Sequence, residues 1–104
     1  MAIFWESNPM SIIPKRQFSF ENLGSGTDSF TLADDETGFY IEADGGSGYI
    51  SFFGTATDNN GLALNKDNQP QRFDVYPGIT VNIAGKSAST EMNVLTFKTA
   101  KGGI

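Results

Sequence analysis

Oxygen-bearing side chains that could bind a cation gather in one turn of the chain, Asp58-Asn59-Asn60-Gly61. Carboxylate and amide oxygens are the ligands that calcium prefers. The EF-hand spacing is not met, because Ala56 stands at one of its ligand positions and no glutamate closes the loop. The same four residues are typical of a tight turn, so the sequence predicts a turn there rather than a metal site.

Two further groups of carboxylates could do chemistry if the fold brought them to a cleft. Glu42 and Asp44 lie on the same side of an expected strand and could resemble the acid pair of a glycosidase. Asp34, Asp35 and Glu36 follow one another in a polar turn, where a cation or a basic partner could neutralise them. The sequence of so small a domain gives no sign of a cleft. We therefore expect no catalytic role and interpret Asp34, Asp35 and Glu36 as a partner-binding acidic turn.

The chain has no cysteine and no histidine, which removes much catalytic and metal chemistry at once. Disulfides, thiolate ligands, thiol nucleophiles, Ser-His-Asp triads and histidine-ligated zinc are all excluded. Gly85-Lys86-Ser87 matches the end of a phosphate-binding P-loop, but Thr80 stands where that loop needs its first glycine and no helix is expected to follow. The sequence therefore predicts a protein that is not an enzyme and has no cofactor and no metal ion.

Aromatic rings with amide groups nearby would suit a sugar, which offers apolar ring faces as well as hydroxyl groups. Trp5, Tyr40, Tyr49 and Tyr76 could stack on a sugar, although most aromatic side chains in a chain with nine phenylalanines must build the core. Tyr76 is close in sequence to several amide side chains in expected loops. The residues that we assign to this alternative, a carbohydrate-binding site, are Asn59, Asn60, Asn65, Asn68 and Tyr76.

Charge is unevenly distributed along the 104 residues, whose net charge is -5. No basic residue occurs between Arg16 and Lys66, and that span holds eight acidic residues, whereas from Lys66 onward five bases face three acids. An acidic surface that keeps the domain soluble would explain this pattern, and so would an acidic surface on one copy that meets a basic surface on the next. Nucleic acid is not expected as a partner, because phosphate binding needs clustered Lys and Arg.

The first fourteen residues, MAIFWESNPMSIIP, are largely apolar, carry one charged side chain and contain two prolines. Proline forbids one continuous helix, so this segment is expected to be an extended arm. Large apolar side chains in water would form an adhesive patch, so the arm must be covered, either along its own domain as an edge strand or on a neighbouring subunit. The arm residues that we assign to partner binding are Ile3, Phe4, Trp5, Met10, Ile12 and Ile13.

The start of the chain does not read as a secretory signal, because no basic region precedes the apolar residues and Glu6 interrupts them. No stretch approaches the roughly 20 apolar residues of a membrane span. The protein is therefore expected to be made in the cytoplasm and incorporated into a virion or a similar assembly.

Short alternating segments separated by turn residues run through the rest of the chain and indicate strands. Two of them, 72–76 and 79–83, are joined by Pro77-Gly78, which fits the centre of a type II turn and predicts an antiparallel hairpin followed by a strand at 93–99. The run 49–57 is apolar on both faces around Phe52 and Phe53 and is expected to be a central strand. The other expected strands are 15–21, 29–32 and 39–43, with a brief pairing at 62–64.

The regular recurrence of short strands and turns predicts an all-β fold. The expected architecture is a small antiparallel β-sandwich of seven or eight short strands, either jelly-roll or immunoglobulin-like. Residues 1–14 are the arm, residues 15–100 the single domain and residues 101–104 a flexible tail. In size, glycine and aromatic content, lack of cysteine and histidine, and its arm, the chain resembles the small β-sandwich accessory proteins of phage particles. That resemblance implies a structural capsid, decoration, vertex or tail subunit that binds copies of itself or other subunits. The alternative is a carbohydrate-binding module.

Overall fold

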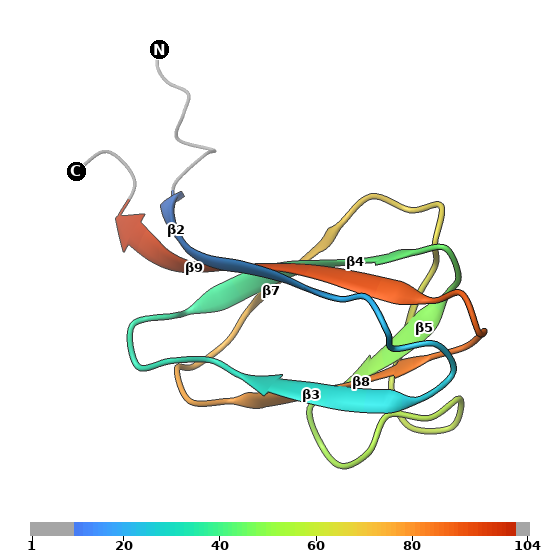
Figure 1. The fold of residues 1–104 in the computed structure, drawn as a ribbon. Helices are drawn as coiled ribbons and strands as arrows, with labels where there is room; N and C mark the ends of the chain where they lie inside the picture. Colours follow the sequence, from blue (N-terminus) through green and yellow to red (C-terminus); the bar gives the residue numbers. More distant parts are fainter. Residues whose placement is uncertain (1–9, 102–104) are drawn as a thin grey trace.

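The computed structural model describes residues 10–101, which contain eight strands and no helix (Figure 1). The strands are β2 (Met10–Phe20), β3 (Thr27–Thr31), β4 (Gly38–Asp44), β5 (Gly48–Ser51), β6 (Leu62–Leu64), β7 (Gln71–Asp74), β8 (Thr80–Gly85) and β9 (Glu91–Lys101). All of their pairings are antiparallel. The all-β fold predicted from the sequence is therefore confirmed.

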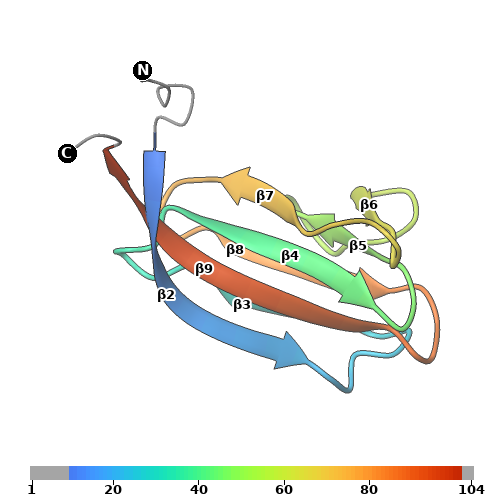
Figure 2. The ribbon, with the colours of Figure 1, turned by 90° about the horizontal axis from the view of Figure 1, so that it is seen from above.

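The strands form two four-stranded sheets, ordered β2-β9-β4-β7 and β3-β8-β5-β6. Their pairing is nested, because β2 pairs with β9, β3 with β8, β4 with β7, and β5 with β6. Pairing of β4 with β9 and of β5 with β8 joins these four pairs into two sheets. Figure 1 shows the sheets one above the other, and Figure 2, seen from above, shows β2 along one edge of the molecule and β6 and β7 along the opposite edge.

Alternate side chains of both sheets meet between the layers and form the core. In β4, Phe39 and Ile41 point inward and are fully buried, whereas Tyr40 lies between them on the outer face. The Phe39 ring meets Phe30 of the other sheet edge-on and stacks on Phe73, with ring centroids 5.3 Å apart in both pairs. The other large side chains of the core are Leu32, Ile50, Leu64, Val81, Ile83, Met92 and Val94. Two sheets that share one apolar core form a β-sandwich.

The predicted hairpin across Pro77-Gly78 is wrong, although Gly78 has the predicted turn conformation. Its φ of 82° is the value that a type II turn requires there. The strands on either side belong to different sheets, because β7 pairs with β4 whereas β8 pairs with β3 and β5. The reason is a contact with a segment distant in sequence: Gly78 N–H donates to the Leu32 carbonyl and Leu32 N–H donates to the Ile79 carbonyl. These bonds tie the chain beyond the turn to the second sheet.

The predicted central strand 49–57 is shorter than expected, because β5 ends at Ser51. The Ser51 hydroxyl donates to the Phe53 carbonyl and accepts from the Phe53 N–H, both at 3.2 Å, which bends the chain sharply. Gly54 follows with a φ of 85°, a conformation that glycine adopts without steric cost. Phe52 still packs against the core, but Phe53 is exposed to solvent.

Candidate functional site

Strands β2 and β9 continue together past the end of the neighbouring strand. β4 pairs with β9 as far as Gly38 and Phe97, whereas β2 and β9 stay paired out to Met10 and Lys101. Residues 10–13 and 98–101 therefore leave the sheet as a two-stranded ribbon, which we call the terminal ribbon (Figures 1 and 2). β2 is an edge strand, so its outer edge has no partner strand within residues 10–101.

Part of the predicted arm lies in the terminal ribbon. Met10 begins β2, Ile12 is half-buried and the Ile13 side chain is 47% exposed. Residues 10–14 thus form a strand that pairs with β9 of their own domain. The remaining arm residues of the prediction, Ile3, Phe4 and Trp5, lie outside the described residues.

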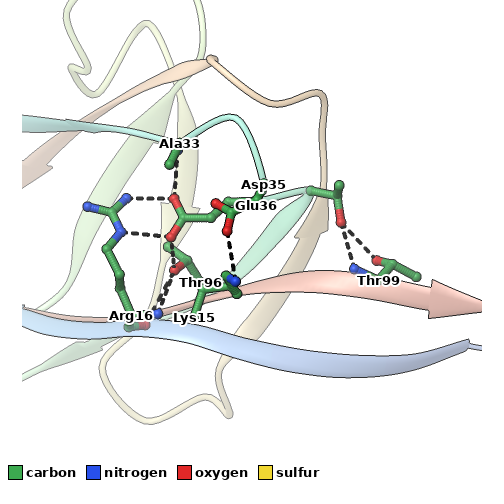
Figure 3. A network of polar contacts seen from close by, with 8 residues as sticks. Lys15, Arg16, Ala33, Asp35, Glu36, Thr96 and Thr99 are labelled. Atoms are coloured by element: carbon green, nitrogen blue, oxygen red, sulfur yellow. Dashed lines mark hydrogen bonds and ion pairs between the residues drawn. The ribbon is translucent and has the colours of Figure 1, made fainter.

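A β-bulge at Lys15 sets the direction of two basic side chains. The pairing of β2 with β9 shifts there, since Pro14 is opposite Phe97 but Arg16 is opposite Thr96. In a regular strand, consecutive side chains point to opposite faces, and an extra residue changes this direction. Lys15 and Arg16 consequently both reach the connection between β3 and β4, where the acidic turn lies (Figure 3).

Glu36 is the centre of this contact and is only 1% exposed. Arg16 binds its carboxylate with two parallel hydrogen bonds, Nε to Oε2 and Nη2 to Oε1, both 2.7 Å long. The backbone N–H of Ala33 donates to Oε1 at 2.7 Å, and the Thr96 hydroxyl donates to Oε2. Arg16 Nη2 also donates to the Thr31 carbonyl at 3.0 Å. A strand of one sheet is thereby tied to a strand of the other.

These contacts lower the pKa of Glu36 from 4.5 to about 2. The hydrogen bonds from Arg16 have the largest effect, and those from Thr96 and Ala33 act in the same direction against the desolvation of the buried carboxylate. The bonds to Glu36 also raise the pKa of Arg16. A carboxylate that accepts four hydrogen bonds and stays ionised at neutral pH serves as a structural tie rather than as a general acid or base.

Thr37 extends the same connection to the other strand of the ribbon. Its backbone N–H donates to the Phe97 carbonyl at 2.8 Å, and the N–H of Thr99 donates to Thr37 Oγ1 at 2.8 Å. The β3–β4 connection therefore holds β2 at the base of the terminal ribbon, through Lys15 and Arg16, and holds β9 within the ribbon, through Thr99. We call this set of residues the ribbon clamp: Lys15, Arg16, Asp35, Glu36, Thr37, Thr96 and Thr99 (Figure 3).

The predicted acidic turn is divided between the clamp and the surface. Glu36 is buried and fully bonded within the domain. Asp35 is exposed and pairs with Lys15 at 2.7 Å, and the hydrogen bond from Lys15 lowers the pKa of Asp35. Asp34 is exposed. Asp34 and Asp35 are the members of the predicted partner-binding turn that a partner can reach.

The residues of the carbohydrate alternative lie on three loops. Asn59 and Asn60 are in the β5–β6 loop, Asn65 and Asn68 in the β6–β7 loop, and Tyr76 in the β7–β8 loop, where its side chain is 83% exposed. The β6–β7 loop precedes β7 and the β7–β8 loop follows it, so these two loops lie at opposite ends of β7. The fold therefore spreads the five residues instead of gathering them at one end of a strand.

Asn60 has a structural role that the sequence pattern does not reveal. Its side-chain amide donates to the carbonyls of Phe53 and Thr55, both at 2.9 Å. Thr57 and Asn60 exchange two backbone hydrogen bonds around Asp58 and Asn59, as the predicted turn requires. These bonds hold the loop in one conformation.

A group of one arginine and two aromatic side chains lies on the outer face of the first sheet. The Arg72 guanidinium lies 4.7 Å from the ring centroid of Phe97, donates to Asp74 at 3.0 Å and contacts the Tyr40 hydroxyl at 3.5 Å. Phe97 is fully buried on this face because Gly38 stands opposite, where a Cβ would clash with its ring. Sequence alternation placed Tyr40 and Arg72 on strands, but nothing in it shows that they cover Phe97.

Within residues 10–101, no three Asp, Glu, His or Cys side chains lie close enough together to hold a metal ion. No helix in the same part of the chain is long and apolar enough to cross a membrane. Comparison with protein families, curated proteins and solved structures returns no match.

Proposed function

We propose that this protein is a non-enzymatic structural subunit of a virion of the phage type, as a capsid, decoration, vertex or tail component. It assembles with copies of itself or with other structural subunits through its N-terminal arm and the sheet surfaces beside it. The observation that carries this proposal is the terminal ribbon. A strand that is clamped to both sheets leads directly into the apolar first nine residues, which include Ile3, Phe4 and Trp5.

The nested strand pairing supports a jelly roll rather than an immunoglobulin-like sandwich. The immunoglobulin fold divides its strands as ABED and CFG, so that its first strand does not pair with its last. Here β2 pairs with β9 and each following pair lies inside the previous one, as in one long hairpin rolled into two sheets. Jelly rolls of eight strands build viral capsid domains and also lectins.

The clamp supports a role in assembly because it makes the ribbon rigid. A two-stranded ribbon is only marginally stable in water by itself. The bonds of Arg16 with Glu36 fix the base of the ribbon, and the bond of Thr99 to Thr37 fixes its β9 strand, so less conformational entropy is lost when a partner binds. Ile13 offers apolar area beside the arm, and burying such a side chain contributes about 1.5–3 kcal/mol.

The electrostatics support a non-enzymatic role. Among residues 10–101, the carboxyl whose pKa departs furthest from its ordinary value is that of Glu36, and the shift to about 2 places it far from the range useful to a general acid or base. Its four hydrogen bonds all come from the protein itself.

Sedimentation velocity on the full chain tests the proposed assembly. We expect oligomers whose size increases with protein concentration, without added nucleic acid, and whose association is weakened by deletion of residues 1–9. The proposal also places synthesis of the protein in the cytoplasm. Deletion of residues 102–104, which follow the other strand of the ribbon, is the matched control and should leave association unchanged. A full-length protein that stays monomeric at every concentration, with no effect of the arm deletion, would contradict the proposal.

Carbohydrate binding is the second candidate, and one observation favours it: Tyr76 presents an aromatic side chain that is 83% exposed on a loop. Tyrosine rings at such positions stack on sugar faces. A glycan array should then show binding that Tyr76→Ala weakens. Tyr49→Ala, at a half-buried position, is the variant used for comparison. An array without binding removes this candidate.

A further inference from the structure

Phe53 is the most exposed large apolar side chain in residues 10–101, with 87% of its area in contact with water. It follows Phe52, which packs against Phe39 and Phe73 in the core, so one phenylalanine of the pair is inside and the other outside. Leaving such a ring in water forgoes about 1.5–3 kcal/mol of burial. An exposed ring of this size marks a surface that a partner can cover.

The loop around Phe53 is built to hold it in place. Ser51 bonds both the N–H and the carbonyl of Phe53, and the amide of Asn60 bonds the carbonyls of Phe53 and Thr55. Ala56 anchors the loop in the core, where it is 1% exposed. These bonds fix the backbone of Phe53, so less backbone entropy is lost on binding, and aromatic anchors carry much of the energy of interfaces.

The neighbouring edge strand differs from the other three edges of the sandwich. β2 carries Pro14, the bulge and two bases, β3 carries Asp28, and β7 carries Arg72 and Asp74. Proline, bulges and charges are the usual protection of a sheet edge against pairing. β6 consists of Leu62, Ala63 and Leu64 without a charge, and Leu62 is 53% exposed. Asn60, two positions before Leu62, donates to the Phe53 carbonyl and so brings the backbone of Phe53 to the start of β6. We call Phe53, Leu62 and the outer edge of β6 the Phe53 surface.

We infer that the Phe53 surface is the docking site for the N-terminal arm of a second copy of this chain, which places Ile3, Phe4 and Trp5 against Phe53 and Leu62. The inference rests on the proposed function, since it identifies where the arm binds. The arm and the surface match in chemistry. The first nine residues carry one charged side chain, Glu6, and residues 52–65 carry only Asp58. Contact between the two apolar centres therefore does not require the desolvation of an unpaired charge.

The position of the surface selects a second copy as the source of the arm. β2, from which the arm starts, and β6 belong to different sheets and lie on opposite edges of the molecule (Figure 2). Nine residues preceding Met10 span about 30 Å when extended, enough to cross an interface to the next copy. Each copy then offers one arm and one surface, which gives a head-to-tail contact that closes into a ring or continues as a filament.

A lipid bilayer is less suited to this surface. Proteins that bind membrane surfaces through apolar anchors also use Lys and Arg to attract anionic lipids. Residues 52–65 contain neither. The other polar side chains of the loop, such as Thr55, Thr57 and Asn59, are exposed hydroxyls and amides of the kind that form the rim of protein interfaces.

The arm carries the only tryptophan of the chain, Trp5, so its fluorescence reports on the arm alone when excited where tyrosine does not absorb. The experiment mixes two variants. The first is the full-length chain with Phe53→Ser, which has an arm but an altered surface. The second is the chain without residues 1–9, which has the surface but no arm and no tryptophan. We expect titration with the second to shift Trp5 emission to the blue and to protect it from acrylamide quenching.

Two controls define the surface. The arm-deleted chain with Phe53→Ser should bind the arm about 10- to 30-fold more weakly, the loss typical of an interface anchor. The arm-deleted chain with Tyr76→Ser, which alters an almost equally exposed aromatic on another loop, should bind as before. Leu62→Ser provides a second variant of the surface, and equal urea midpoints of all variants show that each is folded.

Three results would overturn the inference. Oligomers that need the arm but are equally stable with Phe53→Ser would place the acceptor elsewhere while leaving the proposed function intact. A monomer whose Trp5 emission is shifted to the blue at every concentration would show that the arm binds its own domain. Cosedimentation with vesicles of phosphatidylcholine and phosphatidylglycerol that Phe53→Ser abolishes, without self-association, would assign the surface to a membrane.

Discussion

The ribbon clamp and the β5–β6 loop are both built by side-chain hydrogen bonds, but they hold opposite kinds of group. At the clamp, four hydrogen bonds surround a carboxylate that is 1% exposed. In the loop, the bonds of Ser51 and Asn60 hold a phenylalanine that is 87% exposed. The clamp places charge in the interior and the loop places an apolar ring in water. We therefore expect changes at the clamp to alter folding stability and changes at Phe53 to alter association.

The largest effect should come from removing the cation of the clamp. Arg16→Ala leaves the buried Glu36 carboxylate without its charged partner, which costs 3–5 kcal/mol for a fully buried pair. Because the Arg16 side chain is 44% exposed, we expect about 2–3 kcal/mol, measured as the loss of unfolding free energy in urea. Lys15→Ala at the neighbouring exposed ion pair is the control and should change stability far less. Equal effects of the two substitutions would show that the clamp adds nothing beyond a surface ion pair.

Acid should weaken the clamp selectively. The pKa of Glu36 is lowered in the folded state to about 2, so its contribution is complete above pH 4.5 and is lost as the pH falls toward 2. A shift of this size corresponds to at most about 3.5 kcal/mol. Urea unfolding of Glu36→Gln should therefore show a much smaller decrease of stability between these pH values than the wild type. A decrease of the same size in both proteins would mean that other carboxylates cause it.

A smaller effect is expected from the hydrogen bonds of the loop. Asn60→Ala removes the donors to the carbonyls of Phe53 and Thr55 and should lower the unfolding free energy by about 1 kcal/mol, since both carbonyls can turn to water. Protection of the loop amides from hydrogen exchange should fall as well. Asn65→Ala, whose side chain makes no such bonds in the described structure, is the matched control.

The smallest effect on stability is expected at Phe53 itself. Phe53→Ser should change the unfolding free energy by less than about 0.5 kcal/mol, because the ring is 87% exposed in the folded chain. Denaturant melts of the monomer at low concentration check this. A large loss of stability would show that the ring serves its own domain, and the contrast between clamp and loop would then disappear.

The sequence predicted part of the candidate site for physical reasons that can be named. Asp35 and Glu36 belong to the predicted acidic turn, and the apolar character of the arm is evident from its composition. The pairing of Arg16 with Glu36 is not evident, because the two residues are 20 positions apart and Thr96 is 60 positions beyond Glu36. The bulge that turns Lys15 and Arg16 toward the same connection arises only when β2 pairs with β9.

Local chemistry determined the turns and the alternation of this protein, because φ preferences and the two-residue period of a strand act over a few neighbouring residues. Gly78 adopts its turn conformation, and Phe39 and Ile41 face inward, as the pattern indicates. Only the tertiary structure decided which strands pair and which apolar residue is left outside. The Pro77-Gly78 turn joins two sheets because its backbone bonds Leu32, and Phe53 is exposed because Ser51 ends β5. Both outcomes depend on partners that are distant in sequence or on a bend that alternation does not encode.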